Sequence, residues 1–503
     1  MAMTPNIPLS VWAPDGDPTT PGVLTDVGNL VPTRRGFASD PGPGSFNGLS
    51  LPGKCYGGRL LPINSITPAV MLATSSTLYY YGGSGSLVDR NRASPAYVAP
   101  ADMTVAWRFE QFGEYTLAIQ RDNPLQASAD ITTTDFSDVA DAPSAYTICV
   151  TSNFVMVANT VDVPADNVYR YFDAWHCSAL GDHTDWSPDL ATQCAQGRLL
   201  QTPGPILRLF AYGPDVLAFK RGSMYRGRYV NRPADGIIWE WTVISSEVGI
   251  VGHDAIVQVG GVVYFMTLDG VYAFNGSALR RVESFPRLWW IRAQANTGTD
   301  DSLFMLTQAV YDPVRRVIRW HYVQNDTAQE SEQWMGGCLT YHVETDRWGH
   351  SEIDSEWAFN VPWTTVYVTD AGGIDGTSVE GVGPYTARNV AAYVDSTTHE
   401  LKIYLSTATS SYFITGDVGD DETVSTGVRA RLRFLRAPSS ATMRHQYRMN
   451  LGDDVTQGAD IAYRTDGKFD FSHSARWHRL VFEAFGPFEV TGIRVDAASA
   501  GKQ

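Results

Sequence analysis

Cysteines are scarce in this chain, and nothing in their spacing ties them together. The five are odd in number, widely scattered and never arranged as C-x-x-C: Cys55, Cys149, Cys177, Cys194 and Cys338. Disulfide frameworks and zinc templates need closer, repeated spacings, and combining Cys177 and Cys194 with His176 and His183 fits no such template. We therefore expect reduced, buried cysteines, no metal site and no cofactor.

Long hydrophobic runs are also missing. No stretch of about 18 uninterrupted apolar residues occurs, whereas a membrane-spanning helix needs about 20. The first residues, Met-Ala-Met-Thr-Pro, lack the basic and apolar regions of a signal peptide. The sequence thus predicts a soluble protein that is synthesised in the cytoplasm and does not insert into a membrane.

The signatures of common enzyme classes are absent as well. The sequence contains no nucleophile elbow (G-x-S-x-G), zincin motif (H-E-x-x-H), P-loop or dinucleotide-binding G-x-G-x-x-G. We expect no catalytic residues and no enzyme. Glycoside hydrolysis stays open as an alternative, because it needs only two suitably spaced carboxylates and because 14 tryptophans could stack on sugars.

Basic side chains are outnumbered, and lysine is rare among them. Lys and Arg total 38 against 54 Asp and Glu, which gives a formal net charge of -16. This balance excludes a chain built to coat nucleic acid, because such binding depends on Lys and Arg contacts to phosphates. Nearly all the basic residues are arginines, and a guanidinium group pairs with a carboxylate through two parallel hydrogen bonds.

One group of arginines forms a pattern. Residues 429, 431 and 433 alternate with apolar residues, so on a strand they would project from one face. We predict a surface that docks an acidic neighbouring subunit or an adaptor protein: Arg429, Arg431, Arg433, Arg444 and Arg448. A salt-bridged face exposed to solvent is the alternative.

The abundant residues are those of turns and strands. The 503 residues include 45 Gly, 27 Pro and 12% aromatics, a composition that favours an all-β protein. The clearest segment is Ala255–Val282, where short apolar runs are separated by Gly260-Gly261, Asp269-Gly270 and Asn275-Gly276. Because such pairs supply the positive φ angles of two-residue hairpin turns, this segment predicts a four-stranded meander.

Related but less regular hairpins recur along the chain. They are centred on Gly113, Asn153, Gly222, Asp312-Pro313 and Asp346. A meander cannot bury both of its faces alone, so meanders repeated every 40 to 50 residues or so predict a β-propeller. A run of β-sandwiches is the competing architecture.

Composition changes suggest four segments. Residues 1–50 are rich in Pro and Gly and predict an extended N-terminal arm without a central strand, because proline lacks the N–H that a ladder needs. Residues 51–415 predict the propeller, 416–427 an acidic linker, and 428–503 a small C-terminal β-sandwich module. The arm is expected to pack along the body or a neighbouring subunit.

Acidic clusters lie between the predicted strands. The candidate channel or loop residues are Asp182, Asp185, Asp189, Asp420, Asp421 and Glu422. The simpler interpretation is that they are turn residues whose carboxylates accept local backbone hydrogen bonds, and calcium binding by the first three is another. His253 and Asp254 could form a dyad, but a local cap at a strand entrance is the simpler interpretation.

Several segments resemble one family of virus proteins. They are Thr184-Asp185-Trp186-Ser187, Gly249-Ile250-Val251-Gly252-His253, the Val263–Gly276 meander, the N-x-x-P-T-x-x-G stretch Asn29–Gly36, and the C-terminal stretches Arg476–Leu480 and Phe485–Phe488. Together they are similar to the packaged-DNA stabilisation and tail nozzle proteins of short-tailed bacteriophages. The shared motifs are hairpin patterns spread over all three parts of the chain.

This resemblance implies a structural protein of the virion tail. Such proteins are β-propellers assembled as a ring, commonly a homohexamer, below the portal and adaptor. They continue the DNA channel, retain the packaged genome and release it at infection, while duplex DNA passes without sequence-specific binding. Two alternatives stay open: a propeller glycosidase or sugar-binding tail protein that acts on the host envelope, and a cellular protein-interaction propeller.

Overall fold

The computed structural model of the chain is almost entirely β-structure. It describes residues 6–63, 68–83, 86–162, 169–232, 235–294, 303–324, 327–363, 388–406, 410–464 and 467–502. Within these ranges the α-helices are α1 (Arg287–Gln294) and α2 (Thr327–Glu332), and neither is long enough or apolar enough to cross a bilayer. The all-β prediction is confirmed.

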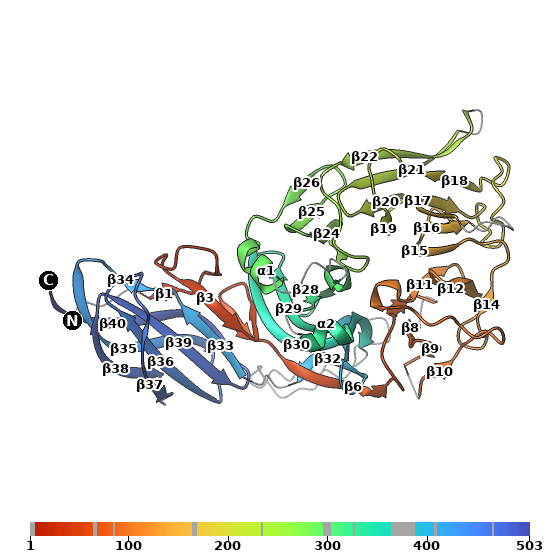
Figure 1. Cartoon of the computed structure of the whole chain (residues 1–503). Coiled ribbons are helices and arrows are strands. Elements are labelled where there is room, and N and C mark those ends of the chain that lie inside the picture. Colours follow the sequence, from red (N-terminus) through yellow and green to blue (C-terminus); the bar gives the residue numbers. More distant parts are fainter. Residues whose placement is uncertain are drawn as a thin grey trace.

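Five separate four-stranded antiparallel sheets form a five-blade β-propeller arrangement (Figure 1). The first blade consists of β7 (Gly58–Leu61), β8 (Ala69–Ala73), β9 (Leu78–Tyr81) and β10 (Val88–Asp89). The second consists of β11 (Arg108–Phe112), β12 (Tyr115–Gln120), β13 (Asn123–Ser128) and β14 (Ser137–Asp138). The third and fourth are β15 (Ser144–Thr151), β16 (Phe154–Asp162), β17 (Tyr169–Cys177), β18 (Ala195–Arg198) and β19 (Ile206–Tyr212), β20 (Asp215–Lys220), β21 (Met224–Arg232), β22 (Ile237–Ser245). The fifth is β23 (Ile256–Val259), β24 (Val262–Thr267), β25 (Gly270–Phe274) and β26 (Leu279–Arg281).

Two further four-stranded ladders, joined through one long strand, lie between the fifth blade and the first. The strands are β27 (Gln308–Asp312), β28 (Val317–Tyr322), β29 (Met335–His342), β30 (Arg347–Trp363), β31 (Arg388–Asp395), β32 (Glu400–Ser406) and β6 (Gly42–Ser50). The first half of β30 pairs with β29 and its second half, from Ser355, pairs with β31. Because β6 pairs with β32, residues before the first blade complete the last ladder.

The turns explain why the meanders form where the sequence predicted them. Gly260 and Gly261 both have positive φ angles, 56° and 84°, as a type I′ hairpin turn requires. Ser152 and Asn153 adopt the same conformation, with φ angles of 49° and 62°, between β15 and β16. The predicted meander over Ala255–Val282 is confirmed as the four strands of the fifth blade.

A second, two-sheet unit extends from the propeller (Figure 1). Its C-terminal strands are β33 (Ser410–Thr415), β34 (Val418–Gly419), β35 (Thr423–Arg436), β36 (Ser440–Arg448), β37 (Thr456–Ala462), β38 (Lys468–Ala475), β39 (Trp477–Phe485) and β40 (Glu489–Lys502). Its N-terminal strands are β1 (Ile7–Pro8), β2 (Val11–Trp12), β3 (Val23–Gly28), β4 (Leu30–Pro32) and β5 (Phe37–Ser39). The strand orders are β4-β5-β40-β35-β38 and β2-β3-β33-β39-β36-β37, and β4 also pairs with β30.

Aromatic side chains join the two sheets of this unit. The ring of Phe482, on β39, lies 6.0 Å from Phe434, 6.3 Å from Phe469 and 5.7 Å from Phe488. Phe434 and Phe469 belong to β35 and β38 of the other sheet. Edge-to-face pairs at such distances add to the free energy gained from burying the rings.

The structure differs from the predicted segments at both ends. The arm was expected to contain no central strand, but β3 lies between β2 and β33, and β4 lies between β30 and β5. That expectation was wrong because β3 contains no proline and Pro32 is the last residue of β4. Pro43 lies in β6, which pairs with β32 and has no second partner among the described strands, as expected for proline in an edge strand.

The C-terminal boundaries also look different in space. β34 and the start of β35 fall inside the predicted linker 416–427. The predicted sandwich over 428–503 stays a prediction as a separate module, because its two sheets also contain strands from residues 7–39 and 410–415. The arm packs on the body, as predicted, with buried side chains of Trp12, Leu24, Leu30 and Phe37.

A buried ion cluster fixes the end of the arm to the propeller. Arg319, on β28, is fully buried and donates two hydrogen bonds of 2.8 and 2.7 Å to the two carboxylate oxygens of Asp40. Asp312 lies 3.4 Å away, Ser351 donates to Asp40, and the Tyr404 ring lies 3.8 Å from the guanidinium carbon. Burial would raise the pKa of Asp40, but the Arg319 charge outweighs it and holds that pKa below its usual value.

Removing one partner of this cluster is expected to be costly. An Asp40→Ala change leaves the buried Arg319 charge short of a counter-ion, so the free energy of unfolding should fall by about 3–5 kcal/mol. The matched control is Asp460→Ala, which breaks the exposed Arg444–Asp460 pair and should cost at most about 1 kcal/mol. Urea denaturation measures both changes, and equal losses in the two variants would contradict the importance of the cluster.

A second contact between the arm and the propeller is aromatic. The ring of Trp12, on β2, lies 4.9 Å from Trp289 of α1 and 6.2 Å from His350 of β30. The Tyr322 hydroxyl lies 3.0 Å from His350 Nε2. Burial disfavours the charged imidazole and lowers the pKa of His350 to about 4.

This buried imidazole makes stability depend on pH. The unfolded chain has the higher His350 pKa, about 6.5, so it binds the proton first as the pH falls. The contribution of neutral His350 is therefore complete above about pH 6.5 and decreases toward pH 4, with a loss of about 2 kcal/mol at pH 5. A His350→Phe variant cannot titrate there, so its free energy of unfolding should fall by about 2 kcal/mol less between pH 8 and pH 5 than that of the unaltered chain. An unchanged pH dependence would refute this assignment.

Candidate functional site

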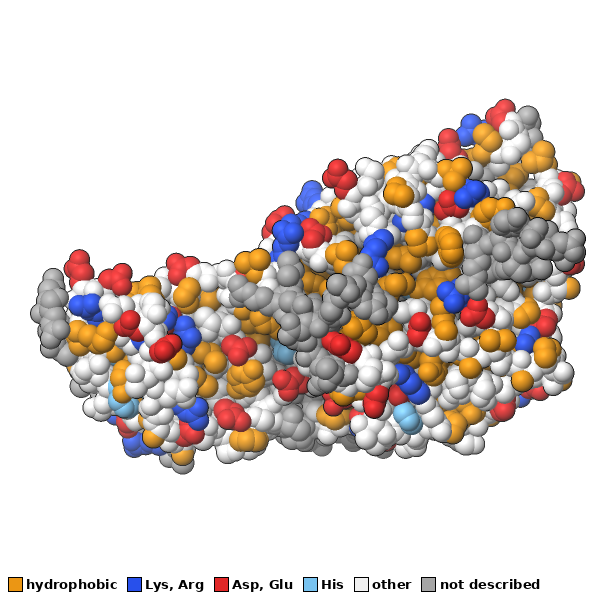
Figure 2. All heavy atoms as spheres, in the orientation of Figure 1, with side chains coloured by type: hydrophobic (Ala, Val, Ile, Leu, Met, Phe, Trp, Pro, Cys, Tyr) orange, Lys and Arg blue, Asp and Glu red, His pale blue; other side chains and the backbone are white. Residues whose placement is uncertain are grey.

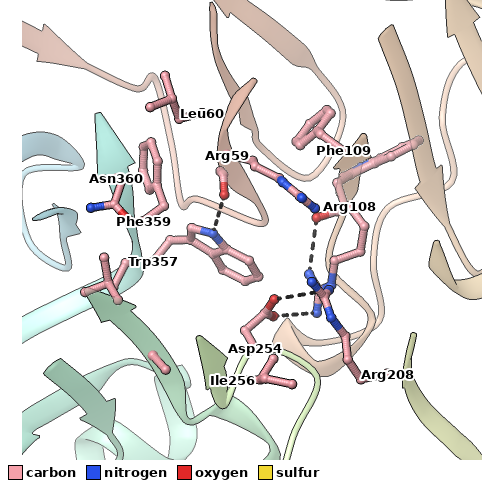
Figure 3. A pocket seen from close by; sticks show the side chains of 15 residues that line it. Arg59, Leu60, Arg108, Phe109, Arg208, Asp254, Ile256, Trp357, Phe359 and Asn360 are labelled. Atoms are coloured by element: carbon pink, nitrogen blue, oxygen red, sulfur yellow. Dashed lines mark hydrogen bonds and ion pairs between the residues drawn. The ribbon is translucent and has the colours of Figure 1, made fainter. Parts of the chain in front are cut away.

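The first strands of the blades surround a cavity of about 230 Å³ at the centre of the propeller (Figure 3). Residues of β7, β11, β19, β23, β27 and the second half of β30 line it. Period-two alternation in each strand sends every second side chain toward the blade interface or the axis. The cavity is therefore built from segments that are up to 300 residues apart in sequence.

Charged side chains from three strands, and from the segment just before β23, meet at this cavity. Arg59 on β7 contacts Glu110 of β11 at 2.5 Å. Arg108 on β11 contacts Asp254, just before β23, at 3.0 Å, and Arg208 on β19 lies 3.9 Å from the same carboxylate. Figure 3 shows Arg59, Arg108, Arg208 and Asp254 converging from different blades.

His253 lies behind this charged wall and is 1% exposed. Arg108 Nε donates to its Nδ1 at 2.8 Å, and Arg208 Nη1 lies 2.8 Å from its Nε2. Burial and the neighbouring guanidinium of Arg108 lower the pKa of His253 well below its usual value. The imidazole is thus neutral at pH 7: its Nδ1 accepts from Arg108, so its Nε2 carries the proton and can donate to Thr147 Oγ1 at 3.1 Å.

Asp254 and Arg208 respond oppositely to this environment. Burial raises the pKa of Asp254, but the charge of Arg108 and the contact with His253 lower this pKa by more than burial raises it. The side chain of Asp254 is therefore an ionised carboxylate. Burial lowers the pKa of Arg208 to about 10, and Asp254 only partly offsets this. His253 and Asp254 do contact each other, at 2.8 Å, but the arginines on both sides oppose the protonated imidazole that a general base would have to form.

Aromatic side chains make the opposite wall. Trp357, on β30, donates its Nε1–H to the carbonyl of Gly58 at 2.9 Å, which fixes the indole beside β7. The guanidinium carbon of Arg108 lies 5.0 Å from the centre of the Trp357 ring, within the range of a cation–π interaction. Phe359 and Leu60 extend this apolar surface.

The arginines predicted for docking have partners within the chain. Arg429 contacts Asp470 at 2.6 Å, and Arg444 contacts Asp460 through two hydrogen bonds of 2.8 and 2.9 Å. Both pairs are partly exposed. These two arginines therefore match the alternative interpretation, a salt-bridged surface.

Arg448 is paired with a buried carboxylate rather than a partly exposed one. Arg448 and Arg479 share the buried carboxylate of Asp417, at 2.6 and 2.8 Å, so Arg448 ties β36 to the segment after β33.

Arg431 and Arg433 are exposed on β35, and among the described residues no ion pair within 4 Å involves either. These two are the predicted arginines that keep a charge available to another molecule.

The first predicted acidic cluster forms turns. Asp182 Oδ1 accepts hydrogen bonds from the backbone N–H and hydroxyl of Thr184, Asp185 accepts from Ser187 N–H, and Asp189 accepts from Ala191 N–H. The Thr184 hydrogen bonds lower the pKa of Asp182. A glycosidase acid needs a raised pKa, so the geometry gives no support to this pair as a catalytic dyad.

The second cluster is also local. Asp420 Oδ1 accepts from the N–H groups of Glu422 and Thr423, Asp421 accepts from Trp477 Nε1 at 3.1 Å, and Glu422 is exposed. None of the six predicted acidic residues lines the central cavity. Across the described ranges, no group of three or more His, Cys, Asp or Glu side chains is arranged to hold a metal ion.

Sequence reasoning missed the central arginines. Arg59, Arg108 and Arg208 each stand between apolar residues in the first strand of a blade, as Gly-Arg-Leu, Trp-Arg-Phe and Leu-Arg-Leu. For Arg59 and Arg208 the available signal is a lone arginine in an otherwise apolar first strand, because such a charge needs a partner across the axis. The strand of Arg108 also contains Glu110 and Gln111, so this signal is missing there. The three arginines come together only because the blades close into a ring.

Comparisons with known proteins leave the family open. No known protein family matches the chain, and no curated protein matches it. Among solved structures, it resembles PorZ, a surface component of the type-IX secretion system of Porphyromonas gingivalis, with 11% identity, coverage of 61% of this chain and 38% of that one, and a TM-score of 0.30.

A second similar structure is the extracellular domain of a protein described as a hybrid two component system from B. thetaiotaomicron. The identity is 10%, the coverage 83% of this chain and 46% of that one, and the TM-score 0.37. The chain thus spans less than half the length of both structures. Overlaps this loose carry no conclusion about activity, partners or location.

Proposed function

We propose that this chain is a structural protein of a bacteriophage tail, which forms a ring below the portal and adaptor and continues the DNA channel. In this role it retains the packaged genome and releases it at infection, without turnover of a substrate. The proposal starts from the resemblance of its hairpin segments to tail nozzle proteins. Its support from the molecule itself is electrostatic.

The observation that carries the proposal is the internal pairing of arginines on a chain with a net charge of -16. Arg429, Arg444 and Arg448 each face a carboxylate of the same chain. On the face seen in Figure 2, acidic and basic side chains are interspersed, and no broad basic field appears. Each Lys or Arg contact to phosphate adds a salt-dependent attachment to DNA, so such a surface suits a passage through which a duplex slides.

The central cavity of one propeller is not the DNA path in this proposal. Its volume of about 230 Å³ is below the 300–1,000 Å³ or so of ordinary small-molecule pockets. A duplex would therefore pass between subunits, through the lumen of the ring. The two-sheet unit, which extends from the propeller (Figure 1), offers a second surface for contacts between neighbouring subunits.

The exposed arginines of β35 are assigned to the contact between subunits. Reversing both charges, Arg431→Glu with Arg433→Glu, should weaken self-association at least tenfold, equivalent to about 1.4 kcal/mol. The matched control is Arg228→Glu with Arg280→Glu, which makes the same charge change at two exposed propeller positions and should leave association unchanged.

Sedimentation velocity of the full chain is the measurement. The unaltered protein and the control should sediment as one closed assembly, at about 331 kDa if it is a hexamer of the 55.2 kDa chain. A monomer at all concentrations would overturn the ring. Release of sugar ends from host polysaccharide by the unaltered protein would instead favour the glycosidase alternative.

A further inference from the structure

The central cavity contains more positive than negative groups. Arg59, Arg108 and Arg208 line it or close its wall, and the carboxylates that face them are Glu110 and Asp254. His253 contributes no charge, because two guanidinium groups surround its ring. Within the described part of the chain, three cations against two anions leave one positive charge without its own counter-ion.

Arg208 is the group with the weakest compensation. Its distance of 3.9 Å to Asp254 is longer than the 3.0 Å of Arg108 to the same carboxylate. Its Nη1 contacts the His253 ring, and its buried Nε has no hydrogen-bond partner among the residues that the structure describes. A buried charge that is short of partners is costly, because its lost hydration is not replaced.

The cavity also has the shape and chemistry of a small binding site. It combines guanidinium groups from three different blades with the apolar wall of Trp357 and Phe359 (Figure 3). Ligand pockets characteristically join an apolar lining to a few convergent polar groups. With water occupying about 30 Å³ per molecule in the liquid, the volume suits a small ion with a few waters.

We propose that this cavity binds one small oxyanion, a carboxylate or phosphate group, between Arg208 and Arg59 at the axis of the propeller. Guanidinium forks match the planar or tetrahedral oxygens of such anions through paired hydrogen bonds. The bound anion supplies the missing negative charge. Because its partners come from β7 and β19, it also ties the first blade to the fourth.

Binding at the axis has a measurable consequence for stability. A ligand that binds only the folded chain raises the melting temperature with its concentration, and the stabilisation keeps growing logarithmically once the concentration exceeds Kd. This inference is independent of ring assembly, because all the contributing residues belong to one chain. Failure of the ring would leave it standing, and failure of anion binding would leave the proposed function standing.

The test is thermal unfolding of the full chain at pH 7.5 and constant ionic strength, with sodium phosphate or sodium acetate replacing sodium chloride. A rise with phosphate alone identifies a phosphate site, and a rise with acetate identifies a carboxylate site. The rise should be absent in Arg208→Gln and intact in Arg444→Gln, which removes an exposed arginine of β36. No rise with either anion, or the same rise in all three proteins, overturns the proposal.

A second measurement keeps the proposal falsifiable if Arg208→Gln does not fold. Arg59 has a side chain that is 38% exposed, so Arg59→Gln should fold and should weaken anion binding severalfold. Equilibrium dialysis of the unaltered chain against labelled phosphate and labelled acetate counts the bound ions directly. We expect about one bound ion per chain, and neither chloride nor dilution into moderate salt should displace it. If neither anion binds, the proposed site is wrong.

Discussion

The buried ion cluster of Arg319 with Asp40 and Asp312 is the constraint on which the rest of the structure depends. Its two-bond contact joins residue 40, at the end of the N-terminal arm, to a strand that lies 279 residues later. Because a buried guanidinium must be paired, the arm cannot leave the propeller without a large loss of free energy. β6, which follows Asp40 directly, is thereby held against β32, where it completes the last ladder.

The same arm connects the propeller to the two-sheet unit. β3 lies in one sheet of that unit beside β33, β5 lies in the other beside β40, and β4 pairs with β30 of the propeller. Trp12 adds an aromatic contact to Trp289 and His350. The two units are therefore joined by the pairing of β4 with β30, which suits the proposed role of retaining a packaged genome.

Local sequence signals were sufficient to predict the meanders, whereas the pairing of strands far apart in the sequence could not be predicted. The turns at Gly260-Gly261 and Asn153 have the φ angles that their residue types favour, so the hairpins could be predicted from short windows. One of the two partners of β3 is β33, nearly 400 residues away, and no local pattern specifies such a pairing. The same holds for the site residues. The turn roles of Asp182 and Asp185 could be predicted from adjacent residues, but Arg59 and Arg208 come together only when the blades close into a ring.

The central claim is that the chain is a tail component on the path of DNA. Electron microscopy of tailed-phage particles from the source of this sequence, with the chain labelled by a specific antibody fragment, tests it most directly. The account predicts label at the tail, in a ring below the portal vertex, with density for a propeller in each subunit. Particles that carry no label anywhere would contradict it.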